Sequence, residues 1–180
     1  ASHVAETCQT STPLIVALRD GRESSPNLSE AMIEGMLRAG AHVLDGGMGR
    51  ELQRSGAPFR QPEWSALALI EAPDMVRAVH ASYLAAGAEV ITTNSYALVP
   101  FHIGAERFTA EAERLADRAG RLAREAAQGF PGARVAGSLP PLFGSYRPDL
   151  FDPAQAAALI APLVAGLAPH IDLWLGETLS

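Results

Sequence analysis

Two acidic residues, Asp45 and Glu177, stand where a carboxylate could do chemistry. Each directly follows a short apolar run of the kind that forms a buried strand, and Asp45 opens the glycine-rich segment 45–49. Glycines there allow positive φ and let the backbone approach a ligand closely. An unpaired carboxylate at the end of an apolar strand carries a large desolvation penalty, so Glu177 needs a partner. Two such groups facing one pocket fit a general acid/base pair, a metal site or a clamp for an ammonium group.

Asp45 and Glu177 also have structural interpretations. A glycine-rich turn after a strand is commonly structural or phosphate-binding, and in the structural case Asp45 caps the turn through its side chain. Phosphate binding is disfavoured because the segment starts with an acidic residue and has no nearby lysine. The glycine spacing also differs from that of dinucleotide-binding loops, which need a third glycine opening a helix. In the structural interpretation Glu177 is a solvated residue of a surface loop.

Four further side chains could belong either to the same pocket or to the core. Trp64 and Tyr96 follow polar loop residues and could wall a small pocket, with plain packing as the alternative for each. His80 and Tyr83 fall on the apolar face of a helix opened by Pro73, at three-to-four spacing, so we interpret both as core residues.

The elements that must position these residues repeat a simple pattern, a short apolar run followed by a longer amphipathic stretch. This pattern predicts βα units around a parallel sheet. The predicted strands are residues 13–18, 41–44, 89–93, 134–138 and 173–176, and the predicted helices are residues 29–38, one opened by Pro73, 105–128 and one opened at Asp152-Pro153. Because parallel strands place their carboxyl ends at one edge, the polar residues that follow them should face one mouth. These residues are Asp45, Asn94, Ser138 and Glu177.

The composition sets limits on the class of protein. The chain has 180 residues, of which 48% are hydrophobic and 19% charged, enough apolar material for one packed domain. A net charge of −6 gives no basic surface for nucleic acid or an anionic membrane. The most apolar region, residues 156–175, is broken by prolines and polar residues, and no signal peptide is recognisable. We therefore expect a cytoplasmic protein with a small-molecule ligand.

Several motifs, taken in order, resemble the N-terminal half of the homocysteine S-methyltransferase family. They are residues 45–52, Trp64-Ser65, His80 to Tyr83 with 86–88, 91–96, 135–138 and 176–178. The resemblance covers residues 41–180 and implies a TIM-type (β/α)8 barrel, of which about five βα units are present, so that the barrel is truncated or incomplete.

The resemblance implies a methyltransferase that makes methionine from homocysteine. The methyl group would come from a sulfonium donor, S-methylmethionine or S-adenosylmethionine, and pass to the homocysteine thiol. In such enzymes the two carboxylates hold the amino group of homocysteine, the paired glycines let its backbone approach, and the aromatic residues line the pocket. The substrate-binding residues implied here are Asp45, Gly46, Gly47, Trp64, Tyr96 and Glu177. The resemblance assigns no catalytic residue within this chain.

The chain departs from the family in its metal ligands. The family holds a zinc ion with three cysteine thiolates, which lie after the sixth and eighth strands of the barrel. Cys8 is the only cysteine here and matches neither position, so a zinc cofactor is expected for the family while its ligands are absent from this chain. One alternative is therefore a catalytically inactive barrel fragment or chimera that lacks the zinc site.

The N-terminal segment departs from the family as well. Residues 13–45 resemble the first βα unit of an α-D-phosphohexomutase, which divides the chain into a mutase-like segment, 1–40, and a homocysteine-binding half-barrel, 41–180. A mutase remnant is a second, weaker alternative. The strand edges that an incomplete barrel exposes favour a homo-oligomer that covers them.

Overall fold

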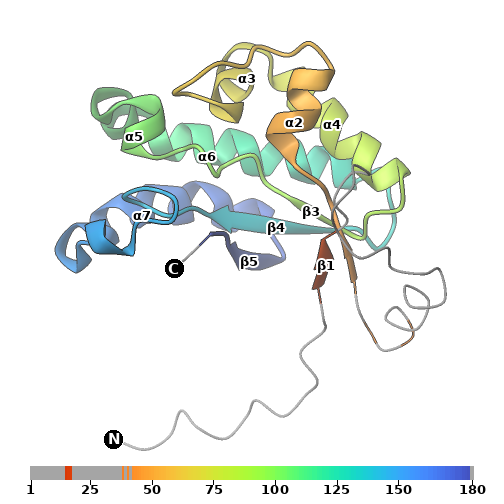
Figure 1. Ribbon diagram of the computed structural model, residues 1–180. Coiled ribbons are helices and arrows are strands. Elements are labelled where there is room, and N and C mark those ends of the chain that lie inside the picture. Colours follow the sequence, from red (N-terminus) through yellow and green to blue (C-terminus); the bar gives the residue numbers. More distant parts are fainter. Residues whose placement is uncertain (1–14, 18–37, 39, 41, 179–180) are drawn as a thin grey trace, which may run out of the picture.

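A computed structural model of the chain describes residues 15–17, 38, 40 and 42–178 (Figure 1). Cys8, the loop resembling the phosphohexomutases at residues 19–26 and nearly all of the helix predicted at 29–38 lie outside the described residues. The candidate site residues all lie within them.

The five predicted strands form one parallel sheet in which each strand lies beside its neighbour in sequence. They are β1 (Ile15–Ala17), β2 (His42–Leu44), β3 (Val90–Thr92), β4 (Arg134–Leu139) and β5 (Leu173–Gly176), in the order β1-β2-β3-β4-β5. In the register, Thr92 pairs with Ala136 and Ser138 with Leu175. Sequential order in a parallel sheet is the topology of a TIM-type barrel, so the predicted α/β class and the partial barrel are confirmed.

Three long helices connect the strands. The helices α4 (Pro73–Ala85), α6 (Ala105–Ala127) and α7 (Pro153–Leu167) follow β2, β3 and β4, as predicted. Figure 1 shows α6 running along the sheet, and it contacts α4 on one side and α7 on the other. The start of α7 is capped by Asp152, whose Oδ1 accepts a hydrogen bond from the Ala154 N–H at 2.9 Å.

Shorter helices occupy segments for which the sequence predicted no helix. Between β2 and α4 lie α2 (Met48–Arg54) and α3 (Ser65–Glu71), and α5 (Pro100–Ile103) precedes α6. The 3₁₀ turns η1 (Pro148–Leu150) and η2 (Ala168–His170) flank α7. These helices were not predicted because helices of one or two turns show little periodicity. They are stabilised by burying residues such as Leu52 and Leu69. Among the described helices, none is long and apolar enough to cross a membrane.

The helices α6 and α7 pack so closely that one position in α7 requires glycine. A Cβ added at Gly166 would lie 2.4 Å from the Glu113 carbonyl oxygen and 2.7 Å from the Ala116 Cβ. Phe108, Leu115 and Leu122 of α6, which are seven residues apart, are also buried. The helix α6 therefore packs into two apolar clusters, one with α4 and α7 and one with Ile91 of β3 and Val135 of β4.

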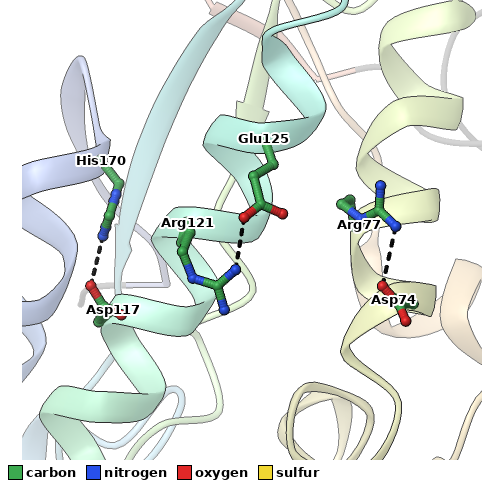
Figure 2. Close-up of polar contacts among 6 residues, drawn as sticks. All are labelled: Asp74, Arg77, Asp117, Arg121, Glu125 and His170. Atoms are coloured by element: carbon green, nitrogen blue, oxygen red, sulfur yellow. Dashed lines mark hydrogen bonds and ion pairs between the residues drawn. The ribbon is translucent and has the colours of Figure 1, made fainter.

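An ion pair also joins α6 to the segment that leads into β5. His170 of η2 lies 2.7 Å from Asp117, measured from Nε2 to Oδ1, and the lack of a side chain at Gly120 leaves room for its ring (Figure 2). The other pairs in Figure 2, Asp74–Arg77 and Arg121–Glu125, lie within single helices. Exposed pairs of this kind contribute little stability, so their role is mainly to keep helix surfaces polar.

His80 is the buried polar residue that α4 places in the core. It is 0% exposed, and neither ring nitrogen has a hydrogen-bond partner among the described residues. Burial lowers the pKa of His80 from 6.5 to about 3. The prediction that His80 is a core residue is confirmed.

Replacing His80 with leucine should remove an acid-sensitive element of stability. Between pH 6.5 and about 3 the unfolded chain binds a proton at this position that the folded chain does not. Wild-type stability should therefore fall as pH falls, by up to about 1.4 kcal/mol per pH unit from this group. Urea denaturation at pH 7, 6 and 5 measures the free energy of unfolding of both proteins. The difference in favour of His80→Leu should grow as the pH falls, and a difference independent of pH would contradict the prediction.

Candidate functional site

Asp45 and Glu177 both lie at the carboxyl end of the sheet, as the sequence predicts. Asp45 directly follows β2 and is 7% exposed, whereas Glu177 directly follows β5 and is half-buried. The charge of Glu177 raises the pKa of Asp45, so the two carboxyl groups lie close enough to interact. Residues from opposite ends of the described chain therefore form one acidic site.

The carboxyl group of Asp45 accepts two hydrogen bonds from one residue of the neighbouring strand. Its Oδ2 accepts a hydrogen bond from the Thr92 N–H at 2.8 Å, and its Oδ1 accepts one from the Thr92 Oγ1 at 2.9 Å. Burial raises the pKa of Asp45 from 3.8 to about 7; the two Thr92 bonds oppose that increase and the charge of Glu177 adds to it. Near neutral pH this carboxyl group therefore exists in both protonation states.

Glu177 is held from β4. The Ser138 hydroxyl donates a hydrogen bond to its Oε2, and its own N–H donates to the Leu139 carbonyl at 3.1 Å. Burial raises the pKa of Glu177, and the Ser138 bond opposes the increase. Both carboxyl groups are thus oriented by hydroxyl groups of the strands β3 and β4.

Gly46 is needed for close packing, and neither Gly46 nor Gly47 has an unusual backbone angle. Positive φ was expected here, but neither residue is among the positive-φ glycines of the described chain, and φ is −68° at Gly47. A Cβ at Gly46 would lie 3.0 Å from the Tyr83 ring, and the Tyr83 hydroxyl donates to the Gly47 carbonyl at 3.3 Å. The interpretation of Tyr83 as a core residue was therefore incomplete: its polar end reaches this turn, and the spacing along the helix could not show that.

Trp64 lies in an exposed aromatic group at the start of α3. It is 45% exposed with φ of 50°, and its ring contacts Phe59 and His102, with centroids 6.1 Å and 6.0 Å away. A left-handed backbone is costly for a bulky residue and occurs most often at functional positions. Asn94 does not point into the shared mouth as expected. Its Nδ2 donates to the Ser65 carbonyl at 3.0 Å and so anchors the segment that carries Trp64.

Tyr96 connects two loops at the same end of the sheet. Its hydroxyl hydrogen-bonds to the Ser145 Oγ at 2.7 Å, which joins the segment after β3 to the one after β4. This hydroxyl is therefore engaged in fixing a loop. Its ring remains a candidate wall of the pocket.

The carboxylates do not lie in either of two hollows found elsewhere in the described chain. A hollow of about 840 Å³ lies between α6 and α7 on the outside of the sheet. An apolar hollow of about 400 Å³ lies in the segment after β4 and is bordered by Leu139, the acceptor of the Glu177 N–H. Buried charge, rather than the size of a hollow, identifies the site.

The described residues do not fit a complete metal site. Nowhere in residues 42–178 do three His, Cys, Asp or Glu side chains come together as metal ligands. Asp45 and Glu177 alone supply two carboxylates, whose bonds to Thr92 and Ser138 already orient them. The acidic pair is therefore better suited to an organic cation than to a metal held by residues 42–178 alone.

Comparison with known proteins gives a consistent family. A family model described as homocysteine S-methyltransferase matches residues 42–180. Homocysteine S-methyltransferase 1 of Brassica oleracea var. italica is 38% identical over 111 residues, covering 61% of this chain and 33% of that protein. The selenocysteine methyltransferase of Astragalus bisulcatus is 44% identical over 87 residues, covering 48% of this chain and 26% of that protein.

A solved structure gives the same result. The homocysteine methyltransferase MmuM from Escherichia coli, in its metallated form, matches with a TM-score of 0.66 and 32% identity, over 82% of this chain and 57% of that chain. The chain spans about a third of the length of the curated relatives it matches. Because the family match begins at residue 42, most of the segment compared with the phosphohexomutases, 13–45, lies outside it.

Replacing Asp45 with asparagine should stabilise the folded protein at alkaline pH. A carboxyl group whose pKa rises from 3.8 to about 7 on folding loses stability as pH rises through that window. Asparagine carries no charge and keeps both contacts, since its oxygen can accept from the Thr92 N–H while its amide donates to the Thr92 hydroxyl. We expect Asp45→Asn to gain ~1–3 kcal/mol at pH 8 and much less at pH 4.5.

Thermal unfolding at both pH values measures this gain. The exposed Asp74 supplies a matched control, because Asp74→Asn changes the same atoms outside the site and should leave the melting temperature within about 1 °C at both pH values. A lower melting temperature for Asp45→Asn at pH 8 would contradict the assignment of Asp45 as a buried, costly carboxylate.

Proposed function

The chain belongs to the homocysteine S-methyltransferase family, and on that premise we propose that its acidic site binds the amino group of homocysteine. The whole protein would transfer a methyl group from a sulfonium donor, S-methylmethionine or S-adenosylmethionine, to the homocysteine thiol. In that reaction a sulfur–methyl bond breaks in the donor, a new one forms on homocysteine, and the thiol proton is released. The product is methionine, so the role is in methionine biosynthesis.

The observation that carries this proposal is a pair of carboxyl groups at one end of the sheet, one buried and one half-buried, whose pKa values are both raised. Burial raises the pKa of Asp45 and of Glu177, and their mutual repulsion adds to the cost at Asp45. Such a pair is destabilising unless a cation binds between the two groups. An α-ammonium group supplies the positive charge and three N–H donors, and charge-assisted hydrogen bonds would orient the amino acid. A phosphorylated sugar would be repelled, which argues against a mutase activity here.

The remaining predicted residues would shape the pocket. We assign Gly46 and Gly47 to the close approach of the amino acid backbone, with Tyr83 supporting the turn from behind. Trp64 would cover the ligand from its exposed loop, and Tyr96 would form a wall next to β3. Aromatic walls and a few polar groups are the usual construction of a small-ligand pocket.

A zinc ion, which would activate the thiol in this family, is not accommodated by the described residues. They contain no cluster of three ligands, and Cys8 lies outside them. We therefore assign to residues 42–178 the binding and orientation of the amino acid and no metal-dependent step. A reduced thiol substrate suits the cytoplasm, where we place the reaction.

Removal of either carboxylate charge should weaken homocysteine binding. A hydrogen bond to a charged group contributes about 1.5–3 kcal/mol, so Asp45→Asn and Glu177→Gln should each raise Kd by about 10- to 100-fold. Isothermal titration measures the change, and Asp74→Asn should bind like wild type. The desamino analogue 4-mercaptobutyrate tests the amino group directly: it should bind weakly and be insensitive to both substitutions. The proposal would be contradicted if wild type bound homocysteine no more tightly than the variant that carries both Asp45→Asn and Glu177→Gln.

Homocysteine affinity should rise with pH up to about 7. Asp45, with a pKa of about 7, must lose its proton to accept the ammonium group. Below that pH the charged form becomes about tenfold rarer per pH unit, and the association constant should fall at the same rate. Titrations at pH 5.5, 6.5 and 7.5 measure the slope. In buffers of different ionisation enthalpy, binding at pH 6 should release about one proton, whereas no proton release would contradict this role of Asp45.

A further inference from the structure

Ser138 occupies an unusual position, because β3 turns away before it can pair with this residue. The last main-chain bond between the two strands runs from the Thr93 N–H to the Ala136 carbonyl at 2.9 Å. Ser138, two residues further along β4, is 0% exposed. Its main-chain N–H and carbonyl groups therefore need other partners, since unpaired buried backbone groups are costly.

Two hydroxyl groups bond to the main chain of Ser138 where β3 no longer does. The Ser138 N–H donates to the Thr93 Oγ1 at 3.0 Å, and the Ser95 Oγ donates to the Ser138 carbonyl at 2.9 Å. The two hydroxyl oxygens lie 2.9 Å apart. Because the Ser95 proton is used on the carbonyl, the Thr93 hydroxyl must donate to Ser95. The bonds run in one direction from the Ser138 N–H back to its own carbonyl, and we call this arrangement the hydroxyl ring.

The Ser138 side chain takes no part in the hydroxyl ring and bonds to Glu177 instead. With both main-chain groups engaged, the Ser138 Oγ is held in the sheet and donates to Oε2 of Glu177. Glu177 is also fixed at its main chain by the Leu139 carbonyl. Asp45 is the ionisable group whose charge interacts with Glu177 across the site. A serine hydroxyl in this position sets where one carboxylate of the pair points.

We propose that Ser138 is a positioning residue, which the hydroxyl ring holds in place so that its hydroxyl aims Glu177 at the ammonium group of the substrate. The inference rests on the proposed function for its ligand, although the contact itself belongs to the free protein. Loss of the hydroxyl would leave Glu177 free to rotate and would remove a donor that stabilises its charged form. The expected effect is weaker binding of the cation, exerted through Glu177 alone.

The test combines a mutant cycle with a measurement that needs no ligand. Homocysteine affinity is measured by isothermal titration for wild type, Ser138→Ala, Glu177→Gln and the double variant. We expect Ser138→Ala to raise Kd about tenfold in the wild-type background and to have almost no effect when residue 177 is glutamine. Ser138→Cys, with a weaker donor of similar shape, should lie between wild type and Ser138→Ala and serves if the alanine variant folds poorly. Ser82→Ala, at an exposed serine of α4 outside the site, is the control and should behave as wild type.

The carboxyl carbon of Glu177, followed by NMR against pH in the ligand-free protein, gives the second measurement. Its titration midpoint should move upward in Ser138→Ala and stay unchanged in Ser82→Ala. If the midpoint moves but wild type does not bind homocysteine, the proposed function fails while Ser138 stands as the residue that controls Glu177. The positioning role would be overturned if Ser138→Ala left the titration midpoint of Glu177 unchanged. It would also be overturned if Ser138→Ala lowered the affinity equally whether residue 177 is glutamate or glutamine.

Discussion

The burial of two carboxyl groups of like charge at one end of a parallel sheet is the constraint on which the site depends. Asp45 and Glu177 both lose solvation, which raises both pKa values, and the charge of Glu177 raises the pKa of Asp45 further. Donors from Thr92 and Ser138 offset part of that cost. The balance leaves the pair short of positive charge, which the ammonium group of the proposed amino acid ligand would supply.

The curvature of the sheet makes this pairing possible. Asp45 follows β2 and Glu177 follows β5, so β3 and β4 lie between them. Neighbouring strands are about 4.8 Å apart, and three such spacings would separate the two groups by about 14 Å in a flat sheet. A sheet that curls toward a barrel brings the strand ends together. The same geometry explains why the donors come from β3 and β4, the strands that the pair spans.

The elements that the sequence predicted correctly are those with a strong repeating pattern. The five strands are short β-rich runs, and the helix α6 has a clear apolar face, so both were recognisable from spacing alone. The helices α2, α3 and α5 were missed because they are too short for a period to show. Their formation depends on the core they pack against, as the burial of Leu52 and Leu69 shows.

The sequence by itself determined the fold class, the family and the placement of Asp45 and Glu177 at strand ends, because period, order and motif are local properties of the chain. Only the tertiary structure decided which side chains meet. It turned Asn94 toward Ser65, brought the Tyr83 hydroxyl to Gly47 and placed Ser138 against Glu177. These contacts depend on where β3 leaves the sheet and how closely helix and turn approach, which residue spacing along the chain does not encode.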